Sequence, residues 1–421
     1  MTDATADTSR RKQALAWAMY DWGNSAFATT VMAGFFPIFF KKYWSAGADV
    51  VHSTFHLGVA NSVASVLVAV LAPMLGAFAD ESRIKKLLLA GFAALGCIGT
   101  AALYGVGKGD WQSATALYVA ATLGFSGSLV FYDALLVSVA TPEESDRVSL
   151  LGYGLGYLGG GLLFAVNVLM TLKPAIFGLA DASASVRWSF VMVGAWWAVF
   201  TWPLLRSVRE PHAAGLQPGA ARRAVVQVVQ TLRRVRAMPV VWTFLVGYWL
   251  YIDAVDTVMR MAVDYGMAIG LKSDSLMIAL LITQFVGFPA AIGYTKLAAV
   301  IGAKRGILLG IGVYVCVTVL ASMMSTALHF YALAVVIGLV QGGVQALSRS
   351  FYSRLIPTDE AGEFFGFYNM LGKFAAVIGP VLMGLVGLLT GSPRLSILSI
   401  TVLFVAGGAV LMRVNEQPAS S

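Results

Sequence analysis

Residues 76–88 read GAFADESRIKKLL, a short charged segment between two long apolar runs. Its pattern returns in part at residues 295–306, TKLAAVIGAKRG, which also lie between apolar runs. The first copy contains Gly76, Asp80 and Arg83, while the second keeps a glycine and two bases. A loop repeated at equivalent places predicts a chain built from two related halves.

The composition excludes an ordinary soluble protein. Of 421 residues, 58% are apolar and 12% are charged, whereas a soluble domain is about half apolar and about a quarter charged. The net charge of +8 comes from 29 Lys and Arg residues against 21 Asp and Glu residues. Most of the basic residues fall in loops on one side of the predicted membrane spans, so they indicate topology, and we expect no nucleic-acid partner.

Apolar runs long enough to cross a bilayer recur along the chain. A span needs about 20 mainly apolar residues, and lipid favours helices because it offers no partner to open backbone groups. We predict an all-α integral membrane protein with twelve spans. They lie near 14–40, 53–79, 87–107, 113–140, 148–171, 188–206, 240–264, 275–298, 306–326, 329–355, 362–389 and 394–413.

The central loop divides the spans into an N-terminal bundle (1–206), a linker (207–239) and a C-terminal bundle (240–421). The Lys and Arg bias places both termini and this linker in the cytoplasm. Within the linker, apolar residues recur at helical spacing among arginines, at Val225, Val228, Leu232 and Val235. This pattern favours a basic amphipathic helix on the membrane surface, and a solvated connector is the alternative.

The first span carries unexpected polar residues in AMYDWGNSAFAT (18–29). Asp21, Asn24 and Ser25 fall on one helical face, and Asp253 and Asp256 repeat this arrangement in the first span of the second half. A carboxylate at bilayer depth costs about 2.5–3.5 kcal/mol or more, so such residues usually face a cavity or one another. We therefore predict a polar cavity between the halves, with hydrogen bonding between helices as the alternative.

Polar side chains also mark the fourth, tenth and eleventh spans. They are Asp133, Gln341, Gln345, Arg349 and Lys373, the last of which shares a face with Asn369. Asp21, Asp133 and Arg349 lie at similar depth from the cytoplasmic ends of their spans. Two acids and one base at one depth indicate a cytoplasmic gate whose ion pairs form and break.

The loop at residues 76–88 resembles the signature G-x-L-A-D-x-x-G-R-K/R of the major facilitator superfamily, through Gly76, Asp80 and Arg83. In the second copy Ala299 stands at the position of the acid. The resemblance implies two six-helix bundles, a central cavity lined by spans 1, 4, 7 and 10, and a gating role for the loop.

Further motifs resemble one branch of this superfamily, the vacuolar effluxer-like, autophagy-associated transporters and their bacterial relatives. The motifs are YDWGNSAFATTV (20–31), GYGLGYLGGG (152–161), YIDAVDT (251–257), GLVQGGVQALSRSFYSRLIP (338–357) and FFGFYNMLGKFAAVIGP (364–380). This resemblance implies export of amino acids or related metabolites, and the compact loops favour a bacterial inner membrane.

We therefore expect a secondary transporter, monomeric in the bilayer, that moves a small solute and is not an enzyme. No metal-ligand cluster or ATP-binding loop is visible in the sequence, so we expect no cofactor and consider coupling to protons. A carboxylate shielded from water has its charged form disfavoured, which makes Asp253 the first candidate proton carrier and Asp21 the second. The alternatives are a receptor or scaffold with the same fold, or an intramembrane enzyme.

Overall fold

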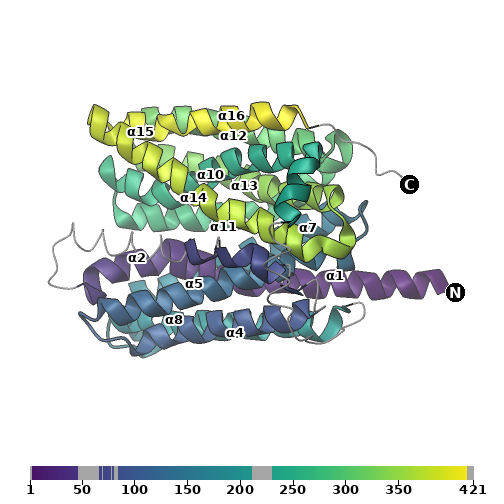
Figure 1. Cartoon of the computed structure of the whole chain (residues 1–421). Coiled ribbons are helices and arrows are strands. Elements are labelled where there is room, and N and C mark those ends of the chain that lie inside the picture. Colours follow the sequence, from purple (N-terminus) through teal and green to yellow (C-terminus); the bar gives the residue numbers. More distant parts are fainter. Residues whose placement is uncertain are drawn as a thin grey trace.

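The computed structural model describes residues 2–45, 66–68, 70–76, 78–79, 84–210 and 230–414. The described residues form helices joined by short connections, with no strand among them. Figure 1 shows two layers of roughly parallel helices, with the N-terminal half in one layer and the C-terminal half in the other.

The N-terminal layer begins with a long helix whose geometry changes along its length. The N-terminal half comprises α1 (Thr2–Ala26), η1 (Phe27–Phe35), α2 (Phe36–Phe39), η2 (Phe40–Trp44), helical residues within Val66–Gly76, α4 (Lys85–Ala102), η3 (Leu103–Gly105), α5 (Trp111–Ala134), α6 (Leu136–Val139), α7 (Ser145–Leu172), η4 (Pro174–Phe177) and α8 (Ala182–Ser207). η1 and η2 are π-helical, and the Phe36 amide donates to the Val31 carbonyl. π-helical turns are rare and are often found at functional sites.

The C-terminal layer repeats the scheme. It comprises α10 (Pro239–Ala268), α11 (Ser273–Ile301), α12 (Ala303–Met323), α13 (Ala327–Leu355), η5 (Thr358–Glu360), α14 (Ala361–Thr390), α15 (Pro393–Ser399) and α16 (Thr401–Met412). Within the described residues nine helices are long and apolar enough to span a bilayer, or ten if Gln230–Ala237 and Pro239–Val263 count as one bent span. These helices are consistent with twelve spans, since Val66–Gly76 and α14 occupy the two other predicted runs.

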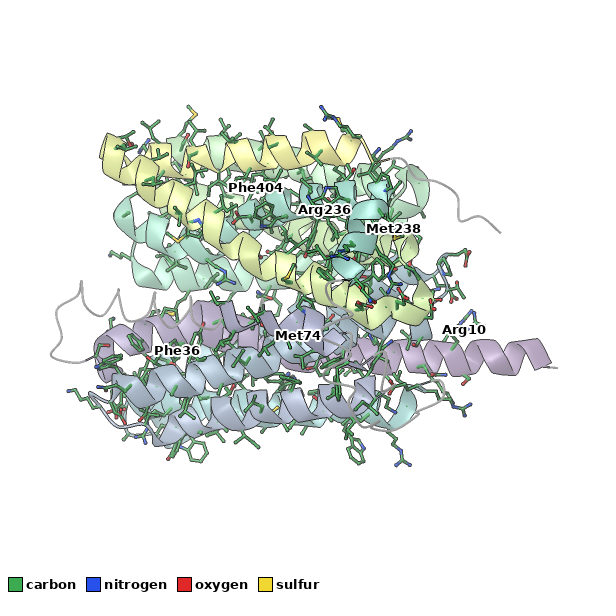
Figure 2. The ribbon with its side chains drawn as sticks, viewed as in Figure 1. Arg10, Phe36, Met74, Arg236, Met238 and Phe404 are labelled. Carbon is green, nitrogen blue, oxygen red and sulfur yellow. The ribbon has the colours of Figure 1, made fainter. Side chains whose placement is uncertain are left out.

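Each half has its own hydrophobic core. The N-terminal core is centred on aromatic residues such as Trp17, Phe27 and Trp197, and the C-terminal core includes Tyr314 and Phe404. Figure 2 shows Phe36 and Phe404 in opposite layers. Because most buried residues of each half pack in a core of their own, each layer is a body held together from within.

A glycine row on α7 lets α1 pack closely against it. A Cβ atom on Gly152 would lie 2.8 Å from Asp21 Oδ2, and one on Gly160 would lie 3.1 Å from the Ser25 backbone. Small residues at every fourth position permit this approach. The row therefore fixes the depth and orientation of the polar face of α1.

Only the last part of the predicted linker helix lies within the described residues, at Gln230–Ala237, and it meets α10 at an angle of 99°. Val225 and Val228 lie outside the described residues. Val235 is buried in the C-terminal core, whereas Leu232 is 41% exposed. We call the end of the molecule where α1 begins and α16 ends the terminal end; Arg10 and Arg236 lie toward it (Figures 1 and 2).

Candidate functional site at the bundle interface

The buried guanidinium of Arg349, on α13, lies between two carboxylates of the other bundle. Its Nη1 atom is 3.2 Å from Asp133 Oδ1 on α5 and 3.7 Å from Asp21 Oδ2 on α1. The Arg349 side chain is 2% exposed. A charge buried in this way is costly unless it is paired and hydrogen-bonded. The structure thus brings together three residues that the sequence analysis placed at one depth.

Arg349 is held by more than its two acids. Its Nε donates to Ser149 Oγ at 2.8 Å and its Nη2 donates to the Ser149 carbonyl at 3.0 Å. Its guanidinium carbon also lies 4.8 Å from the centre of the Trp17 ring and 4.6 Å from that of Tyr153. All three guanidinium nitrogens therefore bind the N-terminal bundle, in an arrangement that a lysine cannot reproduce.

Each carboxylate has a second partner. Tyr132 Oη donates to Asp21 Oδ2 at 2.8 Å, and Asn369 Nδ2 of α14 donates to Asp133 Oδ2 at 3.0 Å. Asp133 therefore receives donors from two helices of the C-terminal bundle. We call Asp21, Asp133, Ser149, Arg349 and Asn369 together the Arg349 cluster.

A second layer of polar contacts joins the bundles nearer the terminal end. Arg354 Nη1 is 2.6 Å from Asp146 Oδ1, and Ser350 Oγ donates to the same oxygen at 2.5 Å. At the depth of the Arg349 cluster itself, Ser149 Oγ also donates to the Ala346 carbonyl at 2.8 Å. These bonds all link α7 to α13, so the two bundles are fastened together at this end.

Two backbone contacts close the same end beside α14. A Cβ atom on Gly76 would collide with the carbonyl oxygen of Gly362, and a Cβ atom on Gly366 would lie 2.7 Å from the carbonyl oxygen of Ala72. Gly76 therefore permits close approach of two helices from different bundles. Its predicted partners in the loop, Asp80 and Arg83, lie outside the described residues.

Asn24 and Gln341, two of the site residues predicted from the sequence, have buried side-chain amides with unused hydrogen-bonding capacity. Asn24 Nδ2 and Gln341 Oε1 find no hydrogen-bond partner among the described residues. Buried polar groups are normally satisfied, so each is free to bind a polar ligand or water. Ser25 packs against Gly156, and both Gln345 and Asp256 are partly exposed.

Asp253 occupies a different setting from the predicted one. The sequence analysis placed it on the cavity between the bundles, but its carboxylate accepts the Gly379 amide of α14 at 3.0 Å on both oxygens. It is 1% exposed. The reason is local: α14 approaches α10 closely at Gly379, and the acid caps a backbone donor. The side chain of Lys373, six residues earlier on α14, lies outside the described residues.

Sequence reasoning missed Ser149 and Tyr132 because one serine or tyrosine among many carries no distinctive signal. The signal for Ser149 is its spacing on α7, where Asp146, Ser149 and Tyr153 fall on one helical face. Asn369 shares a polar face with Lys373, one turn later on the eleventh span, but that spacing does not identify Asp133 as its partner.

The fold is that of a major facilitator superfamily transporter. The human organic anion transporter MFSD10 superposes with a TM-score of 0.71 at 15% identity, covering 96% of this chain and 99% of that chain. The proton:xylose symporter XylE, solved with 6-bromo-6-deoxy-D-glucose, gives a TM-score of 0.68 at 13% identity, covering 97% of this chain and 95% of that chain. The described residues include nine or ten helices that are long and apolar enough to span a bilayer, and with this fold they make the chain a multi-pass membrane protein.

Within that superfamily, residues 45–420 match the model of the family described as vacuole effluxer Atg22 like, and the chain belongs to this family. The uncharacterized MFS-type transporter YxiO of Bacillus subtilis is 36% identical over 411 residues, which are 97% of this chain and 96% of YxiO. Autophagy-related protein 22-2 of Aspergillus clavatus is 25% identical over 281 residues, 60% of this chain but 45% of that longer protein. These relatives and structural neighbours are transporters or members of a transporter family, and none is described as an enzyme.

Proposed function

We propose that this protein is a secondary transporter that works by alternating access, with the Arg349 cluster as its gate at the terminal end. The observation that carries this proposal is one guanidinium shared by two acids of the opposite bundle. Every bond in the cluster that crosses between bundles must break when the bundles part, and each can re-form because all its donors and acceptors sit on rigid helices. A gate of this kind has two defined states.

The terminal end is proposed to be cytoplasmic, in the plasma membrane. Arg10, Lys304 and Arg354 all lie near this end, and cytoplasmic loops of membrane proteins carry an excess of Lys and Arg. The similarity to a Bacillus subtilis transporter over nearly the whole chain supports a bacterial plasma membrane.

The substrate class that fits the site is a small zwitterion such as an amino acid. The cluster offers two carboxylates to an ammonium group and one guanidinium to a carboxylate, and Asn24 and Gln341 add unused amide atoms. A substrate with both charges can replace the partners that the cluster loses when it opens. The family description as an effluxer supports export as the direction.

Proton coupling is proposed at Asp21 rather than Asp253. Two acids share one base in the cluster, so a single proton would neutralise its excess charge. Asp21 is the more distant partner of Arg349, at 3.7 Å against 3.2 Å for Asp133. The titratable groups facing it are Arg349, Asp133, Tyr132 and Tyr153. Arg349 would keep Asp133 when Asp21 is protonated.

Counterflow in proteoliposomes tests this function. Liposomes loaded with one unlabelled amino acid should take up the same labelled amino acid, whereas sugars and small peptides should give no uptake. Arg349→Ala should abolish counterflow. Arg394→Ala is the matched control, because Arg394 is an exposed arginine that binds carbonyls at the opposite end. Absence of counterflow for every solute in the panel, with correctly inserted protein, would contradict the proposal.

A further inference from the structure

Helix α14 contacts both bundles: its first half packs against the N-terminal bundle and its second half against the rest of the C-terminal bundle. Its first half binds the N-terminal bundle, through Asn369 on Asp133 and through the close contacts of Gly362 and Gly366. Its second half packs in its own bundle, where Gly379 meets Asp253 of α10. In Figure 1, α14 crosses its layer obliquely, and its first turns reach the layer of α1.

The contact between α14 and α10, at Gly379 and Asp253, lies beside the proline at which α14 bends most easily. Pro380 has no N–H and its ring crowds the preceding turn, so helices bend at such a residue. The adjacent Gly379 amide donates to both oxygens of Asp253 at 3.0 Å, and Thr257 Oγ1 donates to Asp253 Oδ1 at 3.4 Å. A Cβ atom on Gly379 would collide with the Thr257 hydroxyl. The glycine is therefore needed for α14 to reach the carboxylate.

The two attachments lie on one continuous helix. About 15 Å of helix separates Asn369 from Gly379 at 1.5 Å per residue. The angle at which α14 leaves Gly379 therefore decides whether Asn369 reaches Asp133. A small change of bend at the proline moves the first turns of α14 by several ångströms.

We propose that Asp253 is a positioning residue for gate closure: by binding the Gly379 amide it sets the bend of α14 that brings Asn369 and Gly362 against the N-terminal bundle. This inference rests on the proposed alternating access and assigns Asp253 a role away from the substrate. Without the carboxylate, α14 straightens, Asp133 loses one of its two donors from the other bundle, and the terminal end opens.

Distances between two spin labels at the terminal end test the inference directly. Glu143→Cys, before α7, and Asp359→Cys, before α14, are exposed sites on opposite bundles. The native cysteines Cys97 and Cys316 are first replaced by serine. The labelled protein is measured in lipid nanodiscs by double electron–electron resonance. Asp253→Ala should raise the ratio of the long-distance to the short-distance population about tenfold, the effect of losing one charge-assisted hydrogen bond.

Asp253→Asn keeps an acceptor oxygen and should restore most of the closed population. Thr318→Val is the matched control, because it removes a buried hydroxyl bond between α12 and α16 in the same bundle and should leave the distances unchanged. If Asp253→Ala fails to fold, Gly379→Ala displaces α14 from the other side and should give the same shift. A folded Asp253→Ala or Gly379→Ala protein with unchanged distances would overturn the inference. Failure of the proposed function would instead appear as absent counterflow in the unsubstituted protein.

Discussion

Arg349 of α13 reaches across the bundle interface to Asp133 of α5, with Nη1 3.2 Å from Oδ1. The pair is buried, and it is extended on one side by Asn369 and on the other by Asp21. Isolated buried ion pairs contribute little to stability, because desolvation offsets their attraction. The Arg349–Asp133 pair joins two bundles, so a better explanation is that it breaks when the bundles separate and re-forms in the same place when they close.

Arg349→Lys tests whether the cluster needs a guanidinium. Lysine keeps the charge but cannot bind Ser149 twice and Asp133 at once. Because hydrogen bonds of charged groups contribute about 1.5–3 kcal/mol each, exchange of substrate should fall at least about tenfold. Initial rates of counterflow at matched expression measure this. Arg394→Lys serves as the control, and equal rates for the two variants would contradict the assignment.

Gly76→Ala tests the backbone contact beside α14. The added methyl group would meet the carbonyl oxygen of Gly362, so the terminal end could not close fully and exchange should be lost. Gly91→Ala is a matched change at a helical glycine with open space around it. That control should keep transport and gain stability, by about 0.5–1 kcal/mol, since alanine favours a helix. Thermal unfolding and flux are measured on both proteins, and normal exchange by Gly76→Ala would count against the contact.

Asp21→Asn separates proton coupling from exchange. The amide imitates the protonated acid, while Arg349 keeps Asp133 as its partner. Exchange should therefore survive, and accumulation driven by an imposed pH gradient should disappear. Asp133→Asn should lose both exchange and proton-driven accumulation, because it removes the nearer charged partner of Arg349. If Asp21→Asn accumulates substrate normally under the gradient, Asp21 does not carry the proton.

Much of the fold follows from the sequence, because lipid restricts the chain to apolar helices of known length. The meeting of Asp21, Asp133 and Arg349 was also predictable, since all three lie at the same depth in their spans. The position of Asp253 against α14 could not be predicted from the sequence. A helical face can point to a cavity or to a neighbour in its own bundle, and only the close approach of α14 at Gly379 decides between them.

The contacts of Ser149 with Arg349 and of Asn369 with Asp133 could not be assigned for a related reason. Their roles depend on the rotation of α7 and α14 about their axes, which the glycine contacts set. The division into residues 1–206, 207–239 and 240–421 stays a prediction, as does the gating role of Asp80 and Arg83, which lie outside the described residues.

A disulfide across the bundles tests alternating access most directly. A Cβ atom on Gly154 of α7 would lie 3.2 Å from Ala291 Cβ of α11, close to the separation that a disulfide requires. Gly154→Cys with Ala291→Cys, in a protein without other cysteines, should lose exchange on oxidation and regain it on reduction. Gly99→Cys with Ala121→Cys gives a matched disulfide within one bundle, at 3.4 Å, and should stay active throughout. Full exchange by the oxidised, completely cross-linked Gly154–Ala291 protein would contradict a mechanism in which the bundles separate.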